Sequence, residues 1–368
     1  MPIFMDRHDI VGVTAQDVAE AHQKDLKIQD KFGCKALTYW FDEERGTAFC
    51  LIDADNSKAV EAMHEEAHGL IPHRIIEVNS NLVETFLGRI EDPKVEDNTG
   101  KRDLLIIEEP AFRALLLAEL KNIPSIHLEQ SMASVNSLIS HCRQIIQSKM
   151  EEFNGKEVEL SVHGYTASFA SVTNAVQCAI EIQNHFRESG MNIQLGMSIS
   201  AGDPVTQKEE FFGEVVQSAV RLCHIASEGE VILSSKVKEQ YKKENFGQFL
   251  EANSLKTLDP GDEDFLNRLM DTTEMYWNRE RFNVEDLSRH IGVSRSHLYR
   301  KITNVTGQSA ASFVKEYRLN KALEMIENRQ GNISQIAYET GFNNPSYFSK
   351  CFLTQFGILP SDYANRIA

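Results

Sequence analysis

The most informative absence in this chain of 368 residues is that of any long hydrophobic run. No apolar stretch approaches the roughly 20 residues that a helix needs to cross a bilayer, so no membrane span is expected. The first ten residues, MPIFMDRHDI, lack a basic segment followed by a long apolar one, so no secretory signal is expected either. Both absences favour a cytoplasmic protein.

Cysteine is also scarce, and its pattern excludes a disulfide scaffold. The six cysteines are scattered without CxxC pairs, at Cys34, Cys50, Cys142, Cys178, Cys223 and Cys351. In a chain of this size they indicate reduced thiols. The content of 42% hydrophobic and 25% charged residues is typical of a globular protein, and the length predicts two or three domains.

Positive charge is in short supply overall, but its distribution is uneven. The formal net charge is −16. From residue 281 onward, 11 Lys and Arg residues face seven Asp and Glu residues, which leaves +4 on this part and −20 on the rest. A basic segment attached to acidic domains is compatible with nucleic-acid binding at that end of the chain.

Two polar stretches rich in turn formers indicate domain boundaries. They are EDPKVEDNTGKRD at residues 91–103 and DPGDED at residues 259–264. Few tertiary contacts are expected to cross such segments. They divide the chain into predicted domains at residues 1–91, 104–258 and 262–368.

The N-terminal segment predicts alternating strands and helices in the order β-α-β-β-α-β. Thr14 and Asn56 are typical helix N-caps, and Gly33 and Gly69 mark the helix ends. The strands are expected at residues 3–7, 35–41, 47–52 and 74–78. This order predicts a ferredoxin-like α+β sandwich.

The C-terminal segment predicts an all-α domain with two helix-turn-helix units. The first unit comprises helices at residues 284–290 and 294–302, separated by a glycine. The second comprises helices at residues 333–339 and 345–356, with proline at a first turn, where its missing N–H has no partner to lose. A long amphipathic helix at residues 312–328 joins the two units.

This segment closely resembles the DNA-binding domain of AraC-type transcription regulators. The resemblance rests on Leu287, Ser294, Leu298, Arg300, Gly307, Tyr317, Arg318, Leu319, Ala322, Ile333, Ile336, Ala337, Gly341, Phe342, Ser346, Phe348, Phe352, Gly357, Pro360 and Tyr363. It implies two recognition helices that enter successive major grooves of double-stranded DNA. By position, the implied DNA-contacting residues are Arg295, Ser296, Tyr299 and Arg300 on the first helix and Asn344, Ser346, Ser349 and Lys350 on the second.

The middle segment mixes strands and helices and resembles a class III nucleotide cyclase domain. The motifs RALLLAEL, VHGYTASFASVTNAVQCAIEIQ, LGMSISAGDPV and FFGEVVQSAVRLCHIASEGEVILSS carry the resemblance. In active relatives two aspartates hold the metal ions, and the corresponding positions here are Glu119 and His163. Gln217 replaces a usual Asn, and Arg221 is retained. We therefore expect an inactive α+β domain that serves as a scaffold, with a nucleotide-sensing pocket as the alternative.

The N-terminal segment holds a group of histidines that suggests a metal site. His64 and His68 stand four apart on a predicted helix, where both rings can reach one ion. The HEEAH sequence also fits the HExxH pattern of zinc peptidases, which need a third ligand and a larger domain. The fragments MDRHD, VAEAHQKDL, LTYWFDEERGTAFCLIDA and MHEEAHG resemble a small ferredoxin-like nickel-binding family. The candidate ligands for Ni²⁺ or another divalent transition metal are His64, His68, His8, His22, His73 and Cys50, and histidines without an ion are the alternative.

These observations favour a sequence-specific DNA-binding transcription regulator whose first two domains sense a signal such as a divalent metal. Two other classes remain open: a nucleotide cyclase or nucleotide sensor coupled to DNA binding, and a metal-handling protein. By analogy with the three families, a homodimer is expected, and a small-molecule or nucleotide effector is compatible with the middle domain.

Overall fold

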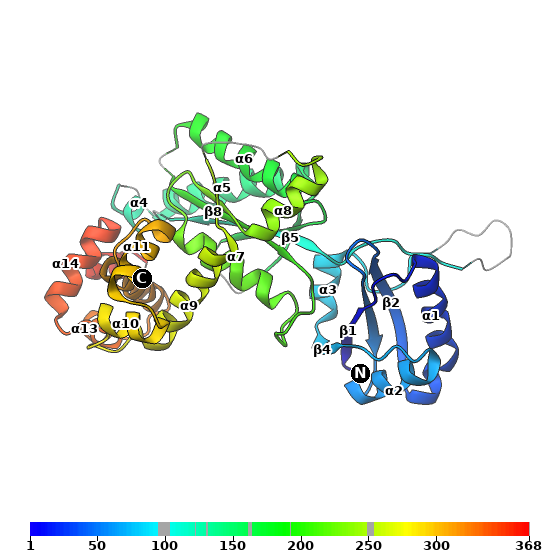
Figure 1. Ribbon diagram of the computed structural model, residues 1–368. Coiled ribbons are helices and arrows are strands. Elements are labelled where there is room, and N and C mark those ends of the chain that lie inside the picture. Colours follow the sequence, from blue (N-terminus) through cyan, green and yellow to red (C-terminus); the bar gives the residue numbers. More distant parts are fainter. Residues whose placement is uncertain are drawn as a thin grey trace.

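The computed structural model shows three units arranged in a row, with the N-terminal unit at one end and the C-terminal helical unit at the other (Figure 1). The structure describes residues 1–94, 104–121, 123–129, 132–160, 164–191, 193–248 and 254–367. Within these residues, no helix is both long enough and apolar enough to span a bilayer.

The N-terminal unit is an α+β layer structure with the predicted β-α-β-β-α-β order. Its antiparallel sheet has the strand order β2-β3-β1-β4. The elements are β1 (Ile3–Asp9), α1 (Ala15–Ile28), β2 (Lys35–Asp42), β3 (Thr47–Asp53), α2 (Ser57–Ala67) and β4 (Arg74–Val78), with a 3-10 turn at Gln29–Phe32. Thr14 caps the start of α1, as the sequence predicts, and it forms a capping box with Asp17.

One face of this sheet packs against α1 and α2, and the opposite face meets the middle unit. Phe4 of β1 packs with Val60 and Met63 of α2. Met5, which points to the other face, belongs to a core cluster that includes Leu115 of the middle unit. A further helix that the sequence analysis did not predict, α3 (Ser80–Leu87), joins this second cluster.

The middle unit is a second α+β layer, built on a six-stranded mixed sheet of order β10-β9-β8-β5-β7-β6. Its strands are β5 (Arg113–Leu120), β6 (Lys156–Glu157), β7 (Tyr165–Phe169), β8 (Leu195–Gly202), β9 (Val231–Leu233) and β10 (Leu255–Thr257). Its helices are α4 (Ile123–Glu129), α5 (Met132–Glu152), α6 (Val172–Ser189), α7 (Gly213–Ile225) and α8 (Ser235–Glu244). Strand β6 pairs with β7 in antiparallel fashion, with Lys156 opposite Ser168 and Glu157 opposite Ala167.

The C-terminal unit is all-helical, and both predicted helix-turn-helix units are present. The helices are α9 (Pro260–Tyr276), α10 (Val284–Ile291), α11 (Arg295–Thr306), α12 (Ala310–Glu327), α13 (Ile333–Glu339), α14 (Pro345–Phe356) and α15 (Pro360–Arg366). Gly292 ends α10 in the left-handed conformation, and Ser294 caps α11 by accepting from His297 N–H. The long helix α12 contributes Phe313 to the core of the first helix-turn-helix unit and Leu319 to the core of the second helix-turn-helix unit. It therefore holds the two together.

The expectation that few contacts cross residues 259–264 is wrong. Asp259 accepts a hydrogen bond from Asp262 N–H and caps α9, whose first turn contains Pro260. Leu266 and Leu269 of α9 lie in one continuous core with Leu222 of α7 and with residues of α10, α11 and α12. The middle and C-terminal units therefore share a hydrophobic core.

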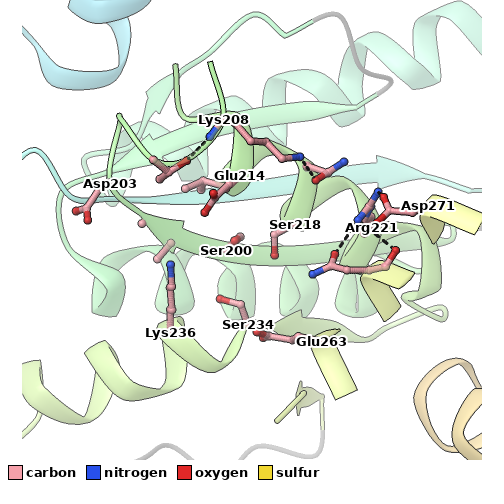
Figure 2. A pocket seen from close by; sticks show the side chains of 16 residues that line it. Ser200, Asp203, Lys208, Glu214, Ser218, Arg221, Ser234, Lys236, Glu263 and Asp271 are labelled. Atoms are coloured by element: carbon pink, nitrogen blue, oxygen red, sulfur yellow. Dashed lines mark hydrogen bonds and ion pairs between the residues drawn. The ribbon is translucent and has the colours of Figure 1, made fainter. Parts of the chain in front are cut away.

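A buried arginine strengthens this junction. Arg221 of α7 forms an ion pair with Asp271 of α9 (Figure 2). It also donates a hydrogen bond of 2.9 Å to the Asn267 side chain and forms an ion pair with Glu274, both of α9. Its side chain is only 3% exposed. At the junction between the N-terminal and middle units, Arg7 of β1 donates a hydrogen bond of 2.9 Å to Val205 O of the middle unit. Each unit is thus tied to its neighbour by polar contacts as well as by packing.

Candidate metal centre and nucleic-acid interface

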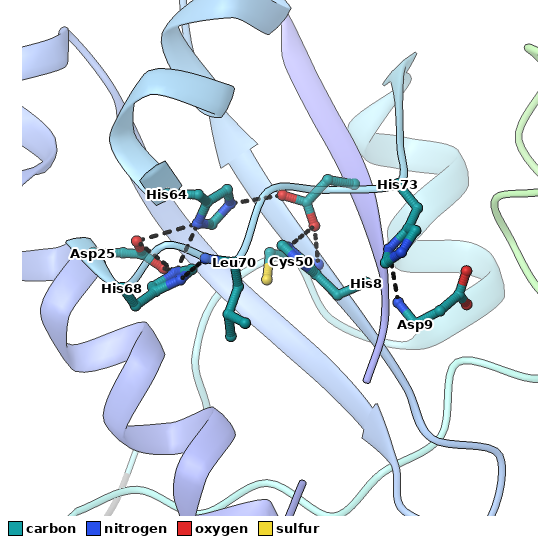
Figure 3. A network of polar contacts seen from close by, with 9 residues as sticks. His8, Asp9, Asp25, Cys50, His64, His68, Leu70 and His73 are labelled. Carbon is teal, nitrogen blue, oxygen red and sulfur yellow. Dashed lines mark hydrogen bonds and ion pairs between the residues drawn. The ribbon is translucent and has the colours of Figure 1, made fainter. Parts of the chain in front are cut away.

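Four side chains, three of them buried and one, Cys50, half-buried, meet between the N-terminal sheet and its helices. His8 of β1, Cys50 of β3 and His64 of α2 lie close together (Figure 3). Asp6 projects from the same face of β1 as His8, two positions away. Each offers one ligand atom, and these atoms lie within 4.8 Å of one another. Among the described residues, a second such group comprises Asp25 of α1 with His64 and His68. His64 is shared by the two groups.

The hydrogen bonds identify which group suits a metal ion better. Leu70 N–H donates to His68 Nδ1 at 3.1 Å, so the neutral His68 ring carries its proton on Nε2 and has no lone pair there for a cation. His64 Nε2 faces Asp6 Oδ2 at 2.7 Å, while His64 Nδ1 lies 3.2 Å from Asp25 Oδ1. This is the arrangement in which an aspartate orients a ligating imidazole through its other nitrogen.

A buried nitrogen without a hydrogen bond also supports a cation at the first group. His8 is 4% exposed, and its Nε2 has no hydrogen-bond partner, the nearest carboxylate atom being Asp6 Oδ1 at 3.4 Å. Burying a polar atom unpaired is costly, and a metal ion would satisfy it. One carboxylate, two imidazoles and one thiol form a donor set that suits Ni²⁺, Zn²⁺ or Cu²⁺ better than Mg²⁺ or Ca²⁺.

The protonation of this centre is governed by charge pairing inside a buried site. Burial lowers the pKa of His64, but Asp6 and Asp25 outweigh this effect and raise it to about 10. Burial would raise the pKa of Asp6, but the His8 and His64 imidazoles hold it well below its usual range. Burial, with Asp6 and Asp25 nearby, raises the pKa of the Cys50 thiol. At neutral pH, His64 and Cys50 therefore carry protons that a metal ion has to displace.

The candidate ligands from the sequence divide into three sets. His8, Cys50 and His64 lie in the first group. His68 caps the C-terminus of α2 instead of lying on the helix, although its Nε2 is still 3.0 Å from His64 Nδ1. With its proton on Nε2, His68 donates to Asp25, whose Oδ1 lies 3.2 Å away, so it holds the carboxylate that orients His64.

The remaining two histidines lie outside both groups. His22 Nε2 lies 3.1 Å from Asp92 Oδ2, and His73 Nδ1 accepts from Asp9 N–H. Asp6 and Asp25 were not among the ligands predicted from the sequence. The DRHD sequence around Asp6 was a signal for it, since alternate residues of a strand share one face, whereas Asp25 had none.

The two proposed recognition helices present exposed polar faces. On α11, Arg295, Ser296, Tyr299 and Arg300 are exposed, whereas Leu298 between them is fully buried. On α14, Ser346 and Lys350 are exposed and Phe348 is fully buried. The apolar positions hold each helix on its core, so that the polar positions face outward.

Several of the predicted DNA-contacting residues already have partners within the chain. Asn344 caps α14 by accepting from the N–H groups of Ser346 and Tyr347, and Ser349 Oγ donates 2.9 Å to Pro345 O. Arg295 forms an ion pair with Glu285, both side chains being more than half exposed. Tyr347, next to Ser346, is 53% exposed and was not among the DNA-contacting residues predicted from the sequence.

The positions that carry the cyclase resemblance are engaged in structural contacts. Glu119 near the end of β5 forms an ion pair with Lys121, and Gln217 of α7 accepts from Lys208 Nζ. Arg221 binds the carboxylates of α9. His163 lies outside the described residues. Among the described residues, Glu119 does not belong to a group that could hold a metal ion.

Comparison with known families assigns both ends of the chain. Residues 287–366 match a family described as a helix-turn-helix domain. Residues 4–78 match a family described as nickel responsive protein SCO4226-like. The chain therefore carries an AraC-type helix-turn-helix domain at its C-terminal end and an SCO4226-like domain at its N-terminal end.

Individual relatives cover parts of the chain. Over 110 residues the chain is 40% identical to "Histidine kinase P4" of Formosa agariphila, covering 30% of this chain and 8% of that protein. Over 78 residues it is 35% identical to "HTH-type transcriptional activator RhaS" of Mannheimia succiniciproducens, covering 21% of this chain and 29% of that protein. The solved structure of SCO4226 from Streptomyces coelicolor A3(2) is 34% identical, covers 21% of this chain and 94% of that one, and has a TM-score of 0.20. The chain spans less than a third of the length of these two curated relatives.

Proposed function

We propose that this protein is a sequence-specific DNA-binding transcription regulator whose activity responds to a divalent transition metal, with nickel as the first candidate. The proposal rests above all on two helix-turn-helix units held by one helix, α12, whose residues lie in the cores of both. A rigid connection of this kind fixes the separation of two recognition helices, as binding to successive grooves requires. As a regulator of this type, the protein acts in the cytoplasm and as a homodimer.

The DNA-binding part of the proposal is tested by electrophoretic shift of the full chain on the double-stranded region upstream of its own gene. We expect Arg295→Ala and Lys350→Ala each to weaken binding by about 1–3 kcal/mol where the lost contact is to a base. Lys242→Ala is a matched control, because Lys242 is an exposed lysine on α8 of the middle unit. Binding that is unchanged in both DNA-face variants would remove these residues from the interface.

For the sensing part, Asp6, His8, Cys50 and His64 would hold the ion, with Asp25 orienting His64. A bound ion would link β1, β3 and α2, because its ligands would come from all three elements. Calorimetric titration of Ni²⁺ into the wild type and into His64→Ala and His68→Ala variants tests this proposal. We expect His64→Ala to lose Ni²⁺ binding. His68→Ala should still bind Ni²⁺, but more weakly, because His68 lies outside the ligand set. Equal heats from all three proteins would refute the metal centre.

The middle unit is, in this proposal, a cyclase-like scaffold without cyclase activity. The supporting observation is that Glu119 is paired with Lys121 and that Arg221 binds α9. Incubation of the protein with ATP or GTP and Mn²⁺ tests this, and a cyclic product would overturn it.

A further inference from the structure

A polar cavity of about 390 Å³ lies at the junction between the middle and C-terminal units. It is bounded by the end of β8, one side of α7, the start of α8 and one side of α9 (Figure 2). A volume above roughly 300 Å³ is in the range of sites for small organic ligands. Its walls come from both units, so a ligand here would contact the DNA-binding unit directly.

Three cationic side chains line this cavity. Lys236 extends from α8 into its centre, and Lys208 lies on the opposite wall (Figure 2). Lys236 Nζ forms no hydrogen bond or ion pair within the described part of the chain. Burial raises the pKa of Asp203 and of Glu263, and the nearby charge of Lys236 opposes this rise. Arg221, buried at the third side, leaves its Nε without a hydrogen-bond partner. The cavity thus offers positive charge that the protein only partly uses.

Carboxylates and hydroxyls occupy the remaining wall. Glu214 of α7, Ser200 of β8 and Ser218 of α7 all line the cavity (Figure 2). Asp203 adds a buried carboxylate oxygen, Oδ1, that has no hydrogen-bond partner. Such acceptors suit the hydroxyl groups of a sugar, whereas lysine and arginine suit a phosphate.

We propose that this cavity binds a small phosphorylated sugar, either as a free sugar phosphate or as part of a nucleotide, and that this ligand regulates DNA binding. The inference deepens the proposed function and rests on it for its regulatory part. The phosphate lies against Lys236 and Arg221, and the sugar hydroxyls donate to Glu214 and Asp203.

The route to the DNA-binding unit runs through Arg221. Its present anionic partners, Asp271 and Glu274 of α9, have side chains that are 61% and 42% exposed, so they can turn into solvent at little cost. The buried guanidinium cannot remain without an anion, and a phosphate matches its planar fork. A phosphate on Arg221 therefore displaces α9 carboxylates.

Helix α9 transmits this exchange because of what it contacts. It packs against α7 on one side and against α10 and recognition helix α11 on the other. Lys301 of α11 also pairs with Asp262 of α9 at 2.5 Å. A ligand that loosens the contacts of α9 with α7 changes the position of α11, and linkage requires that DNA alter the affinity for the ligand by the same factor.

Calorimetric titration of the full chain with ribose 5-phosphate tests the site. We expect binding to the wild type, a loss of about tenfold or more in affinity for Lys236→Met, and no change for Lys242→Met, an exposed lysine of the same helix outside the cavity. Ribose without phosphate should not bind. Titrations with AMP and glucose 6-phosphate separate the two ligand sources. Tighter binding of AMP identifies a nucleotide, and tighter binding of glucose 6-phosphate identifies a free sugar phosphate. Circular dichroism checks that Lys236→Met and Lys242→Met are both folded.

Two results would overturn the inference: no binding of ribose 5-phosphate, AMP or glucose 6-phosphate to the wild type, or equal affinities for wild type and Lys236→Met. DNA binding of the same samples, with and without ligand, is measured by fluorescence anisotropy. A ligand that binds the cavity but leaves DNA affinity unchanged would also overturn the regulatory part. If DNA binding occurs while no ligand binds, only this inference fails; if the ligand binds and DNA does not, the proposed function fails.

Discussion

Removing the buried imidazole of His64 should change how the stability of the metal-free N-terminal unit depends on pH. In the folded chain the pKa of His64 rises from 6.5 to about 10, because Asp6 and Asp25 overcome the opposing effect of burial. A raised pKa in the folded state stabilises the protein fully below the unfolded pKa, and this contribution is lost as pH rises through the folded pKa. The loss for His64 therefore falls between pH 6.5 and about 10.

The size of this effect follows from the shift. Each unit of pKa shift corresponds to about 1.4 kcal/mol of stability. Because His64 titrates together with the carboxylates that it contacts, the full shift overstates its own contribution, and we expect the free energy of unfolding to fall by about 3 kcal/mol across this pH window. Asp6 acts in the opposite direction, because its lowered pKa contributes stability that is lost on acidification below its ordinary value of 3.8. The metal-free unit should thus be most stable between these two transitions.

The assay is urea unfolding at pH 7 and pH 10 in the presence of a chelator, followed by the fluorescence of Trp40. Trp40 is fully buried in the N-terminal unit, and a Trp277→Phe background removes the other tryptophan. His64→Gln should flatten the alkaline slope, whereas His185→Gln, at an exposed histidine of α6, should leave it intact. An identical slope in wild type and His64→Gln would refute the charge assignment.

Three further predictions concern the C-terminal half. Leu269→Ala, at a fully buried position of the core shared by two units, should cost about 3 kcal/mol and destabilise both together; denaturation curves of the two units that separate would contradict a shared core. Ser294→Ala removes the N-cap of α11 and should lower the free energy of unfolding by about 1 kcal/mol, while Ser294→Gly loses less; equal losses would show that the cap is unimportant. Lys350→Ala should reduce the salt dependence of DNA binding by about one counterion if Lys350 contacts phosphate, as measured by binding at several NaCl concentrations.

Much of the local structure was predictable because its signals are local. The capping box of Thr14 and Asp17, the glycine that ends α10 and the serine that caps α11 all act within one helical turn. The same holds for α9, although we interpreted residues 259–264 as a boundary. An aspartate cap followed by proline and acidic residues in a first turn is also a helix-start signal, and composition alone could not separate the two interpretations.

The candidate site was only half predictable. The histidine content of the first 73 residues indicated a metal centre, but Asp25 comes from α1 and lies 39 positions from His64. His22 and His73 looked equivalent to His8 in the sequence, yet they point to other partners. Which side chains share a site depends on how helices dock on the sheet, and periodicity gives no information about that contact.

The sequence by itself determined most helices and strands of the two end domains and both helix-turn-helix units, because caps, turns and hydrophobic periodicity act over a few residues. The tertiary structure alone decided that Asp6 and Asp25 surround His64, that Arg221 binds α9, and that two units share one core. These contacts join residues far apart in the chain, and they depend on packing and burial, which no local pattern encodes.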